Sequence, residues 1–238
     1  VVFEFEKEMY LKEGMKADWF GHPLLEIVHP RNTREIFLKK NNLAPDTKFI
    51  GLFPGSRLQE IERILPVMRN SLAELSRQGL IYKGIVGCAP GIDDKLYRNL
   101  GGANLLYLRA QTYDLMAYSE LNLVASGTAT LECAILGRPL FILYKTSPAT
   151  YHIAKTLIKI PFVGLVNVVA GEKIIPEFIQ GDCRPDKIAG QMQIFFNEDR
   201  YKNEMLARIS KIKSKLGQPG ASMKVAEAVL SLLDRAAN

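Results

Sequence analysis

The order of short apolar runs and longer amphipathic segments is the feature that most restricts the fold of this chain. Five apolar runs have the length of strands: Phe49–Phe53, 81–86, 105–108, Leu121–Ala125 and Leu140–Tyr144. Segments with helical spacing lie between them, at Leu58–Arg77, 93–100, 113–119 and 127–136. Strands that alternate with helices form βαβ units with parallel strands. The runs are apolar at nearly every position, as in a sheet covered on both faces. The prediction is an α/β fold, a Rossmann-like parallel sheet flanked by helices.

The pattern changes after the fifth run and predicts mainly helices. Four segments have helical character, at 148–159, 185–196, 199–216 and 222–236. The sequence GQPG at 217–220 interrupts the pattern, so the last helix is expected to pack away from the sheet. Residues 1–20 have the pattern of a strand-helix-strand segment that starts with Val in mid-strand, which indicates a piece of a longer protein.

Composition narrows the function classes. The 238 residues carry a net charge of +6, which fits an anionic substrate, an anionic membrane surface, nucleic acid or ordinary solubilising charge. Basic residues are scattered without an aromatic platform, which disfavours a nucleic-acid reader. Cys88, Cys133 and Cys183 are widely spaced, which favours a reduced cytosolic compartment and disfavours a zinc site. No apolar run approaches the roughly 20 residues of a membrane span.

The first predicted strand leads into the turn Pro54-Gly55-Ser56-Arg57, ahead of the helix Leu58–Arg77. Gly55 allows a sharp turn, and Ser56 can cap the helix. Arg57 lies near the helix start, where a guanidinium and free N–H groups would together hold a phosphate. A plain turn with a solvated arginine explains the same residues, and the spacing of a Walker loop is absent.

The strand Leu121–Ala125 ends in Ser126, Gly127 and Thr128 before another helical segment. The N–H groups of these small residues could bind a pyrophosphate at the helix start. Glu132 lies one turn deeper on the face of Thr128, and its two carboxylate oxygens can accept both protons of a ribose diol. On these residues alone, a helix-capping Ser126 and a solvated Glu132 remain open.

Two more segments are interpreted as strand ends. GCAPG at 87–91 could line a base pocket or form an ordinary turn. Asn167 is a polar residue within the apolar part of GLVNVVAGE, residues 164–172. An asparagine in such a run is usually buried, with a hydrogen-bonding role that is either structural or directed to a ligand.

Four stretches taken together resemble the lipid-A-disaccharide synthase family: WFGHPLLE at 19–26, LFPGSRLQEI at 52–61, ASGTATLEC at 125–133 and IPFVGLVNVVAGEKIIPEFIQ at 160–180. The resemblance covers nearly the whole chain but only the later part of the family's sequence. It implies the donor-binding half of a GT-B glycosyltransferase. Residues 1–20 would be a remnant of the amino-terminal domain, 21–216 the UDP-sugar-binding domain, and 217–238 a helix that could pack on the other domain.

The resemblance also implies a reaction. A hexosyltransferase of this family joins UDP-2,3-diacylglucosamine to 2,3-diacylglucosamine 1-phosphate with inversion, giving lipid A disaccharide 1-phosphate and UDP, and no metal or other cofactor is implied. The substrate-binding residues carried over are Gly55, Ser56, Arg57, Ser126, Gly127 and Thr128 at the diphosphate, Glu132 at the ribose and Asn167 near the donor.

Charge development indicates how such a reaction would proceed. As the sugar–phosphate bond breaks, the UDP oxygens gain negative charge, which Arg57 and the helix amides could stabilise. Inversion also needs a general base for the acceptor hydroxyl, and the sequence supplies no convincing one. That base is expected on the missing domain. The hypothesis is therefore that this chain alone holds UDP but turns over poorly or not at all.

The acylated substrates imply a cytoplasmic protein that associates peripherally with the anionic inner membrane, and a homodimer is possible. The segment 148–159 carries Lys155 and Lys159 beside Leu157 and Ile158. A basic amphipathic helix of this kind can lie on anionic lipid. An ordinary surface helix packed on the sheet accounts for the pattern equally well.

Other functions remain open at this point. The nearest are UDP-GlcNAc proteins of the same fold, either the GlcNAc transferase of peptidoglycan-precursor synthesis or a UDP-GlcNAc 2-epimerase. The stretches FGHPLLE and VGLVNVVAG favour the lipid A enzyme over both. A non-catalytic module that binds UDP-sugars is the alternative from a different class.

Overall fold

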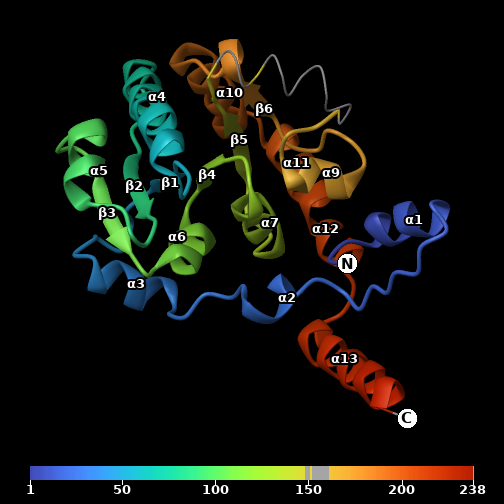
Figure 1. The fold of residues 1–238 in the computed structure, drawn as a ribbon. Helices are drawn as coiled ribbons and strands as arrows, with labels where there is room; N and C mark the ends of the chain where they lie inside the picture. The colour runs from blue at the N-terminus through green and yellow to red at the C-terminus, as the bar shows by residue number, and fades with distance from the viewer. Residues whose placement is uncertain (148–150, 152–160, 238) are drawn as a thin grey trace.

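The computed structural model describes residues 1–147, 151 and 161–237 (Figure 1). Within them, parallel strands form a single sheet in the order β3-β2-β1-β4-β5-β6. The strands are β1 (Phe49–Phe53), β2 (Lys83–Cys88), β3 (Leu106–Arg109), β4 (Leu121–Ala125), β5 (Leu140–Tyr144) and β6 (Glu177–Ile179). The parallel α/β prediction is confirmed, and each predicted strand is present. The second is shifted two residues along the chain, and the three-residue β6 was not predicted.

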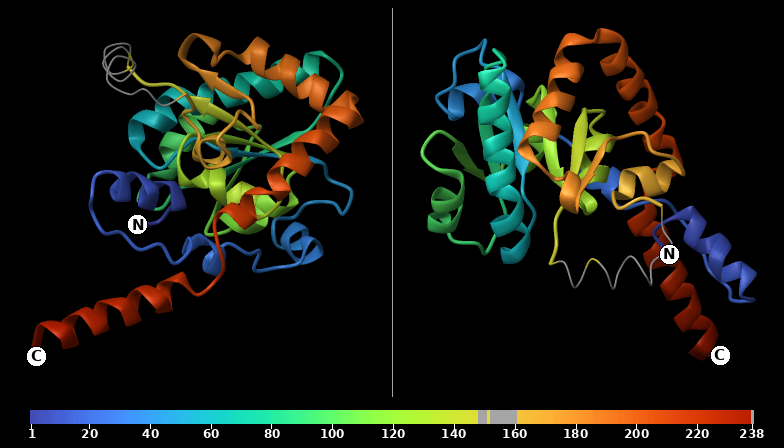
Figure 2. Two further views of the ribbon diagram at one scale, coloured as in Figure 1. Left: turned by 90° about the vertical axis from the view of Figure 1, so that its right-hand side faces the viewer. Right: turned by 90° about the horizontal axis from the view of Figure 1, so that it is seen from above.

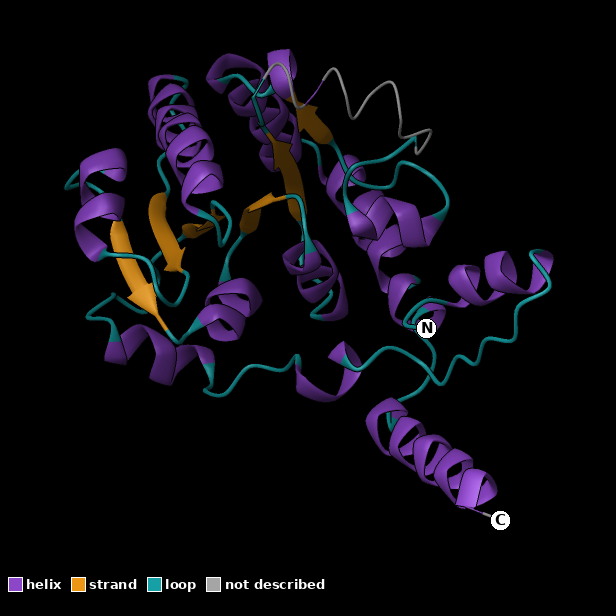
Figure 3. Ribbon diagram, viewed as in Figure 1, coloured by secondary structure: helices purple, strands orange, loops and turns teal. Residues whose placement is uncertain are grey.

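Helices cover both faces of the sheet (Figures 1 and 3). The connecting and flanking helices are α3 (Arg34–Lys40), α4 (Leu58–Arg77), α5 (Asp94–Gly101), α6 (Thr112–Tyr118), α7 (Thr128–Ile135), α9 (Leu165–Ala170), α10 (Pro185–Asn197), α11 (Asp199–Ser210) and α12 (Ile212–Lys215). The short α2 (Leu24–Ile27) and a 3₁₀ turn at Gln180–Asp182 lie in connections. Helices α4, α5 and α10 pack together on one side, and α6, α7, α9 and α12 pack on the other.

The sheet reverses its direction of winding between β1 and β4. The chain adds β2 and β3 on one side of β1, and then β4, β5 and β6 on the other. β1 and β4 are direct neighbours, with Phe53 opposite Val124 near their carboxyl ends. The turns that follow these two strands therefore lie side by side. Ligands of open parallel sheets bind in the crevice at such a switch point.

The core explains why these segments form these elements. Strand β1 is buried at every position, as a central strand between two helix layers requires. Helix α4 buries Ile61, Leu65, Met68 and Leu75, which recur at helical spacing on one face. Burial of side chains of this size stabilises the fold by about 1.5–3 kcal/mol each. This packing fixes α4, and with it the turn at its start.

The first 20 residues differ from the prediction. They contain α1 (Glu4–Lys12), and no strand is assigned in this part of the described chain. The Glu6 carboxylate accepts hydrogen bonds from the backbone N–H groups of Val2 and Phe3. Because these amides cap a helix, they are not available to a strand ladder. The strand-helix-strand prediction for residues 1–20 is therefore wrong.

Two later segments also differ. GLVNVVAGE was interpreted as a strand end, yet it contains α9, which ends at Gly171 with a left-handed φ of +77°. The helix expected over 199–216 is two helices, α11 and α12, that meet at Lys211. The proposed amphipathic helix at 148–159 lies outside the described residues, apart from Tyr151.

The last helix, α13 (Ala221–Ala237), projects from the body of the molecule (Figures 1 and 2). The prediction that it packs away from the sheet is confirmed. Several of its large apolar side chains are exposed: Met223, Val225, Val229, Leu230, Leu232 and Leu233. Packing of this helix on another domain stays a prediction.

Candidate functional site

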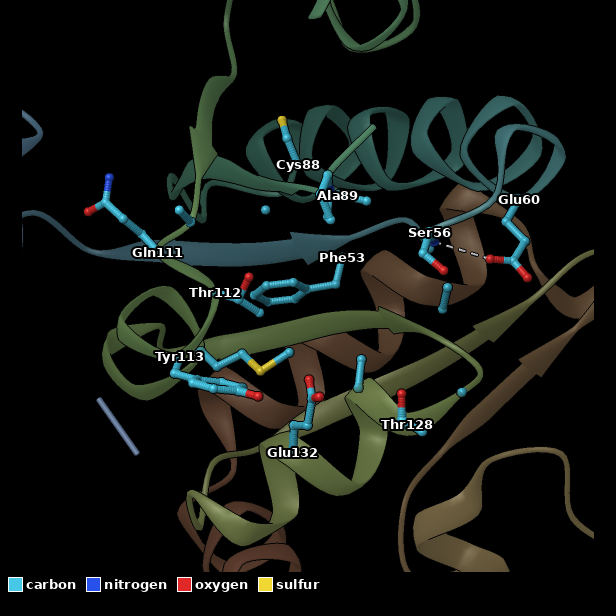
Figure 4. Close-up of a pocket in the computed structure, with 18 of the residues that line it drawn as sticks. Phe53, Ser56, Glu60, Cys88, Ala89, Gln111, Thr112, Tyr113, Thr128 and Glu132 are labelled. Atoms are coloured by element: carbon cyan, nitrogen blue, oxygen red, sulfur yellow. Dashed lines mark hydrogen bonds between the residues drawn. The ribbon is translucent and has the colours of Figure 1, made fainter. Parts of the chain in front are cut away.

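A cavity of about 800 Å³ lies at the carboxyl ends of the central strands (Figure 4). It is bounded by the turns after β1, β2, β3 and β4 and by the starts of α4, α6 and α7. Residues predicted for the site that line the cavity are Gly55, Ser56, Arg57, Ser126, Gly127, Thr128 and Glu132. The structure thus brings together both turns that the sequence singled out. Asn167 is absent from the lining.

The β4–α7 turn presents free backbone donors to this cavity. Among the described residues, the amides of Gly127, Thr128 and Ala129 have no hydrogen-bond acceptor. A Cβ added to Gly127 would meet no heavy atom within 4 Å, so its α-carbon faces open space. Unpaired N–H groups at a helix start carry partial positive charge and attract anions. This turn can therefore bind a phosphate through its backbone.

Ser126 contributes differently from the prediction. Its backbone N–H donates to the Leu143 carbonyl on β5 at 3.0 Å, and its hydroxyl donates to the Val163 carbonyl at 2.7 Å. The Ser126 amide is therefore part of the sheet ladder and is not available to a pyrophosphate. The expectation of a free N–H group at Ser126 is therefore not met, and a substrate-binding role of Ser126 stays a prediction. Ser126 instead ties the turn to the segment before α9.

Glu132 stands at the cavity wall. No hydrogen bond or ion pair to its carboxylate is found within the described part of the chain, and burial raises its pKa. Burial also raises the pKa of the neighbouring Tyr113, and the charge of Glu132 adds to the effect. Figure 4 shows both side chains directed into the same space. Burying a carboxylate without a hydrogen-bond donor lowers the stability of the folded protein. A bound diol would supply two such donors.

In the β1–α4 turn, the two amides that precede α4 are occupied. Glu60 Oε2 accepts from the N–H groups of Ser56 and Arg57, at 3.3 and 3.4 Å, and Glu60 Oε1 pairs with Arg57 Nη1 at 2.9 Å. Gly55 has a φ of +112°, and a Cβ there would lie 2.4 Å from Glu60 Oε2. An internal carboxylate therefore fills the two amides before α4, whereas the amides of Leu58 and Gln59 have no acceptor among the described residues. The turn also offers a ligand the Arg57 side chain, which is 82% exposed.

The far end of the cavity lies between the ends of β2 and β3. Cys88 and Ala89 line it from one side, and Gln111 and Thr112 line it from the other (Figure 4). Burial raises the pKa of the Cys88 thiol to about 11, so it is a poor nucleophile at neutral pH. The base-pocket interpretation of GCAPG fits this position.

Sequence reasoning missed the β3 side of the cavity. The segment 110–113 lines the site, and Ala110 has a left-handed φ of +56°, which its sequence did not reveal. Arg31 also lines the cavity, although it precedes β1. Asp114 explains its position, because one carboxylate oxygen accepts from the amides of Arg31 and Asn32 at 2.6 and 3.1 Å. The two segments are more than 80 residues apart, so no local pattern could have paired them.

Asn167 is a structural residue. Its side-chain nitrogen donates to the Ile175 carbonyl and to Glu177 Oε1, and its oxygen accepts from the amides of Ile174 and Ile175. The side chain is fully buried, with its hydrogen-bonding capacity used within the protein. Glu177 also accepts from the amides of Val163 and Gly164. Asn167 and Glu177 thus hold the segment that anchors Ser126. The structural role expected as one alternative accounts for these contacts, and a position of Asn167 near the donor stays a prediction.

The described residues contain no group of three or more His, Cys, Asp or Glu side chains with the geometry of a metal site. None of the helices within the same residues is long and apolar enough to cross a membrane.

Comparison with known proteins places this site in a family context. A sequence model of the lipid-A-disaccharide synthetase family matches residues 1–229. The lipid-A-disaccharide synthases of Geobacter sulfurreducens and Syntrophus aciditrophicus are 35% and 33% identical to the chain, over 99% of its length. The chain spans 62% of the length of each of these curated relatives.

Solved structures show the same fold at low identity. The UDP-GlcNAc 2-epimerase of Neisseria meningitidis, bound to UDP-GlcNAc, has a TM-score of 0.65 at 16% identity, covering 97% of this chain and 60% of that one. WaaG, a glycosyltransferase involved in lipopolysaccharide biosynthesis, has a TM-score of 0.51 at 17% identity. The match covers 85% of this chain and 51% of WaaG. The predicted fold is confirmed as a Rossmann-like half of the GT-B type.

Proposed function

This chain belongs to the lipid-A-disaccharide synthetase family, and from that premise we propose that it is the UDP-sugar-binding half of a glycosyltransferase of lipid A synthesis. One observation carries the proposal. The free amides of the β4–α7 turn and the unpaired carboxylate of Glu132 open into one cavity at the switch point of the sheet. A ligand with both a phosphate and a diol satisfies both groups.

A uridine diphosphate has the right order of groups for this cavity. In the proposed arrangement, its diphosphate lies against the amides of Gly127 and Thr128, with the Arg57 guanidinium nearby. The ribose hydroxyls donate to Glu132, one helical turn deeper. The base enters the space between Ala89 and Gln111.

The proposed reaction is the family's: transfer of diacylglucosamine from UDP to the sugar hydroxyl of diacylglucosamine 1-phosphate, with inversion and without a cofactor. Arg57 and the α7 amides stabilise the charge that develops on the departing UDP. We expect the general base and the rest of the cleft in the part of the relatives' length that this chain does not span. We therefore expect this chain alone to bind UDP without sustained turnover, and steady disaccharide synthesis by it would contradict that expectation.

The acyl chains of such substrates place the proposed enzyme at the cytoplasmic face of the inner membrane as a peripheral protein. The family match favours this function over the epimerase alternative, which shares the fold at 16% identity. A non-catalytic UDP-sugar module would bind the same nucleotide, so the two are separated by activity after adding the part of the relatives' length that this chain does not span.

Calorimetric titration with UDP and 2′-deoxy-UDP tests the binding site directly. We expect the wild type to bind UDP about tenfold more tightly than 2′-deoxy-UDP, because a hydrogen bond to a charged group contributes about 1.5–3 kcal/mol. Glu132→Gln should weaken UDP binding and remove most of this discrimination. Glu74→Gln is the matched control, since Glu74 lies at the far end of α4 and pairs with Arg77.

The deoxy ligand makes the result specific to the Glu132 contact. If Glu132→Gln lowered the affinity for both ligands equally, the ribose assignment would be wrong. If the wild type bound neither nucleotide, the proposed function itself would fail.

A further inference from the structure

A second cavity of about 550 Å³ adjoins the first on the side of β5. Arg57, Glu60 and Ser126 line both cavities, so the two spaces share a wall. The new lining comes from the first turns of α4 and from the segment after β5, including Arg63 and Lys145. None of the roles assigned above uses these two residues.

The second cavity has an excess of positive charge. It is lined by Arg57, Arg63 and Lys145 against the single carboxylate of Glu60, which already pairs with Arg57. Arg63 and Lys145 are half-buried, and neither has a carboxylate within ion-pair distance among the described residues. Two half-buried cations without counter-ions favour the binding of an anion.

Both cations are attached to fixed backbone. Arg63 lies on the second turn of α4, and its Nη1 donates to Gln59 Oε1 at 3.4 Å. Lys145 follows the last residue of β5 directly, and the next residue, Thr146, is held through both its amide and its carbonyl by the Gln180 side chain. The positions of these charges are therefore set by the sheet and by α4.

At the α4 start, Glu60 occupies the amides of Ser56 and Arg57, whereas Leu58 and Gln59, which line this cavity, have amides without an acceptor among the described residues. These backbone donors add to the cationic side chains in attracting an anion. Arginine and lysine side chains recognise phosphate through charge-assisted hydrogen bonds. The cavity is also large enough for a sugar beside the phosphate.

We propose that the second cavity binds the phosphate monoester of a sugar phosphate, with Arg63 and Lys145 as its ligands. This inference rests on the proposed function, in which one substrate is a nucleoside diphosphate sugar and the other a sugar 1-phosphate. The shared wall then places the acceptor next to the donor diphosphate. The competing occupant is the donor diphosphate itself, and the experiment separates the two.

The test is an NMR titration of the 238-residue chain with glucosamine 1-phosphate, without UDP and with saturating UDP. Arg63→Gln and Lys145→Gln should each weaken glucosamine 1-phosphate binding about tenfold, while UDP affinity changes less than about twofold. Lys145→Arg, which keeps the charge, should retain most of the affinity. Glucosamine without the phosphate should bind far more weakly to the wild type.

Arg77→Gln and Lys83→Gln are the matched controls. Arg77 is the last residue of α4, and Lys83 is the first residue of β2, at the amino end of the strand, whereas the cavity lies at the carboxyl ends of the strands. Neither substitution should change the binding of glucosamine 1-phosphate or of UDP. Wild-type affinity for glucosamine 1-phosphate in both test variants, or no binding to the wild type, would overturn the inference. A parallel loss of UDP affinity would assign the two cations to the donor instead. If UDP did not bind, the proposed function would fail. The titration with glucosamine 1-phosphate in the absence of UDP would still test whether the second cavity binds a sugar phosphate.

Discussion

The turns after β1 and β4 look alike in sequence but differ in what they offer a ligand. Each follows a buried central strand, contains a glycine and starts a helix. In the β1–α4 turn, Glu60 accepts from two backbone amides and pairs with Arg57. In the β4–α7 turn, neither the amides of Gly127, Thr128 and Ala129 nor the carboxylate of Glu132 has a partner within the part of the chain that the structure describes.

The third residue of each helix accounts for the difference. In α4 this residue is Glu60, which reaches back to form a capping box with Arg57. In α7 it is Thr130, whose hydroxyl donates to the Gly127 carbonyl and leaves the amides free. In the β1–α4 turn the amides before the helix are thus filled by its own carboxylate, and the Arg57 guanidinium is exposed. In the β4–α7 turn the amide of Gly127, before the helix, has no acceptor among the described residues.

The largest expected effect concerns the support of the open turn. Asn167→Ala removes four hydrogen bonds and leaves buried backbone groups near Ile174 and Ile175 unsatisfied. We expect a loss of about 4 kcal/mol in the free energy of unfolding, measured by urea denaturation. Asn70→Ala, at an exposed position of α4, should cost less than about 0.5 kcal/mol. Equal stability of the two variants would refute the structural role of Asn167.

The second prediction compares the two helix starts directly. Thr128→Pro and Leu58→Pro each delete one amide at the first position of a helix, where proline is tolerated. UDP affinity should fall about tenfold in Thr128→Pro, as for the loss of one charge-assisted bond, and less than about twofold in Leu58→Pro. Thr128→Ala separates the side chain from the amide and should bind UDP nearly as the wild type does. Similar losses in both proline variants would remove the distinction between the turns.

The smallest effect concerns the two acids. Burial raises the pKa of Glu132 in the folded protein above its ordinary value, so its ionised form opposes folding. Relative to Glu132→Gln, the wild type should therefore lose stability as pH rises from about 4 to 7. Glu60→Gln, which removes a paired carboxylate, should bring no such gain at any pH. Thermal denaturation of the three proteins across this range measures the difference, and an unchanged gap between wild type and Glu132→Gln would contradict the unpaired state of Glu132.

Much of the fold could be predicted because its signals are local. A strand such as Leu121–Ala125 is apolar at almost every position, and the helix Leu58–Arg77 repeats its apolar residues on one face. The short β6 escaped prediction since three residues carry no periodicity. A strand was predicted at the start of the chain because the first residues include Val and Phe, which favour strands. The segment instead leads into α1, because the Glu6 carboxylate accepts from the amides of Val2 and Phe3.

The sequence by itself determined the order of strands and helices and the two turns that meet at the switch point, since both depend on residue type and spacing along the chain. Only the tertiary structure decided which amides are free and which acid is paired. It also decided that Asn167 supports the site from behind and that Arg31 reaches the cavity. The physical reason is that many hydrogen bonds join residues far apart in sequence. Which donors and acceptors are left for a ligand is known only when those partners have been brought together by the fold.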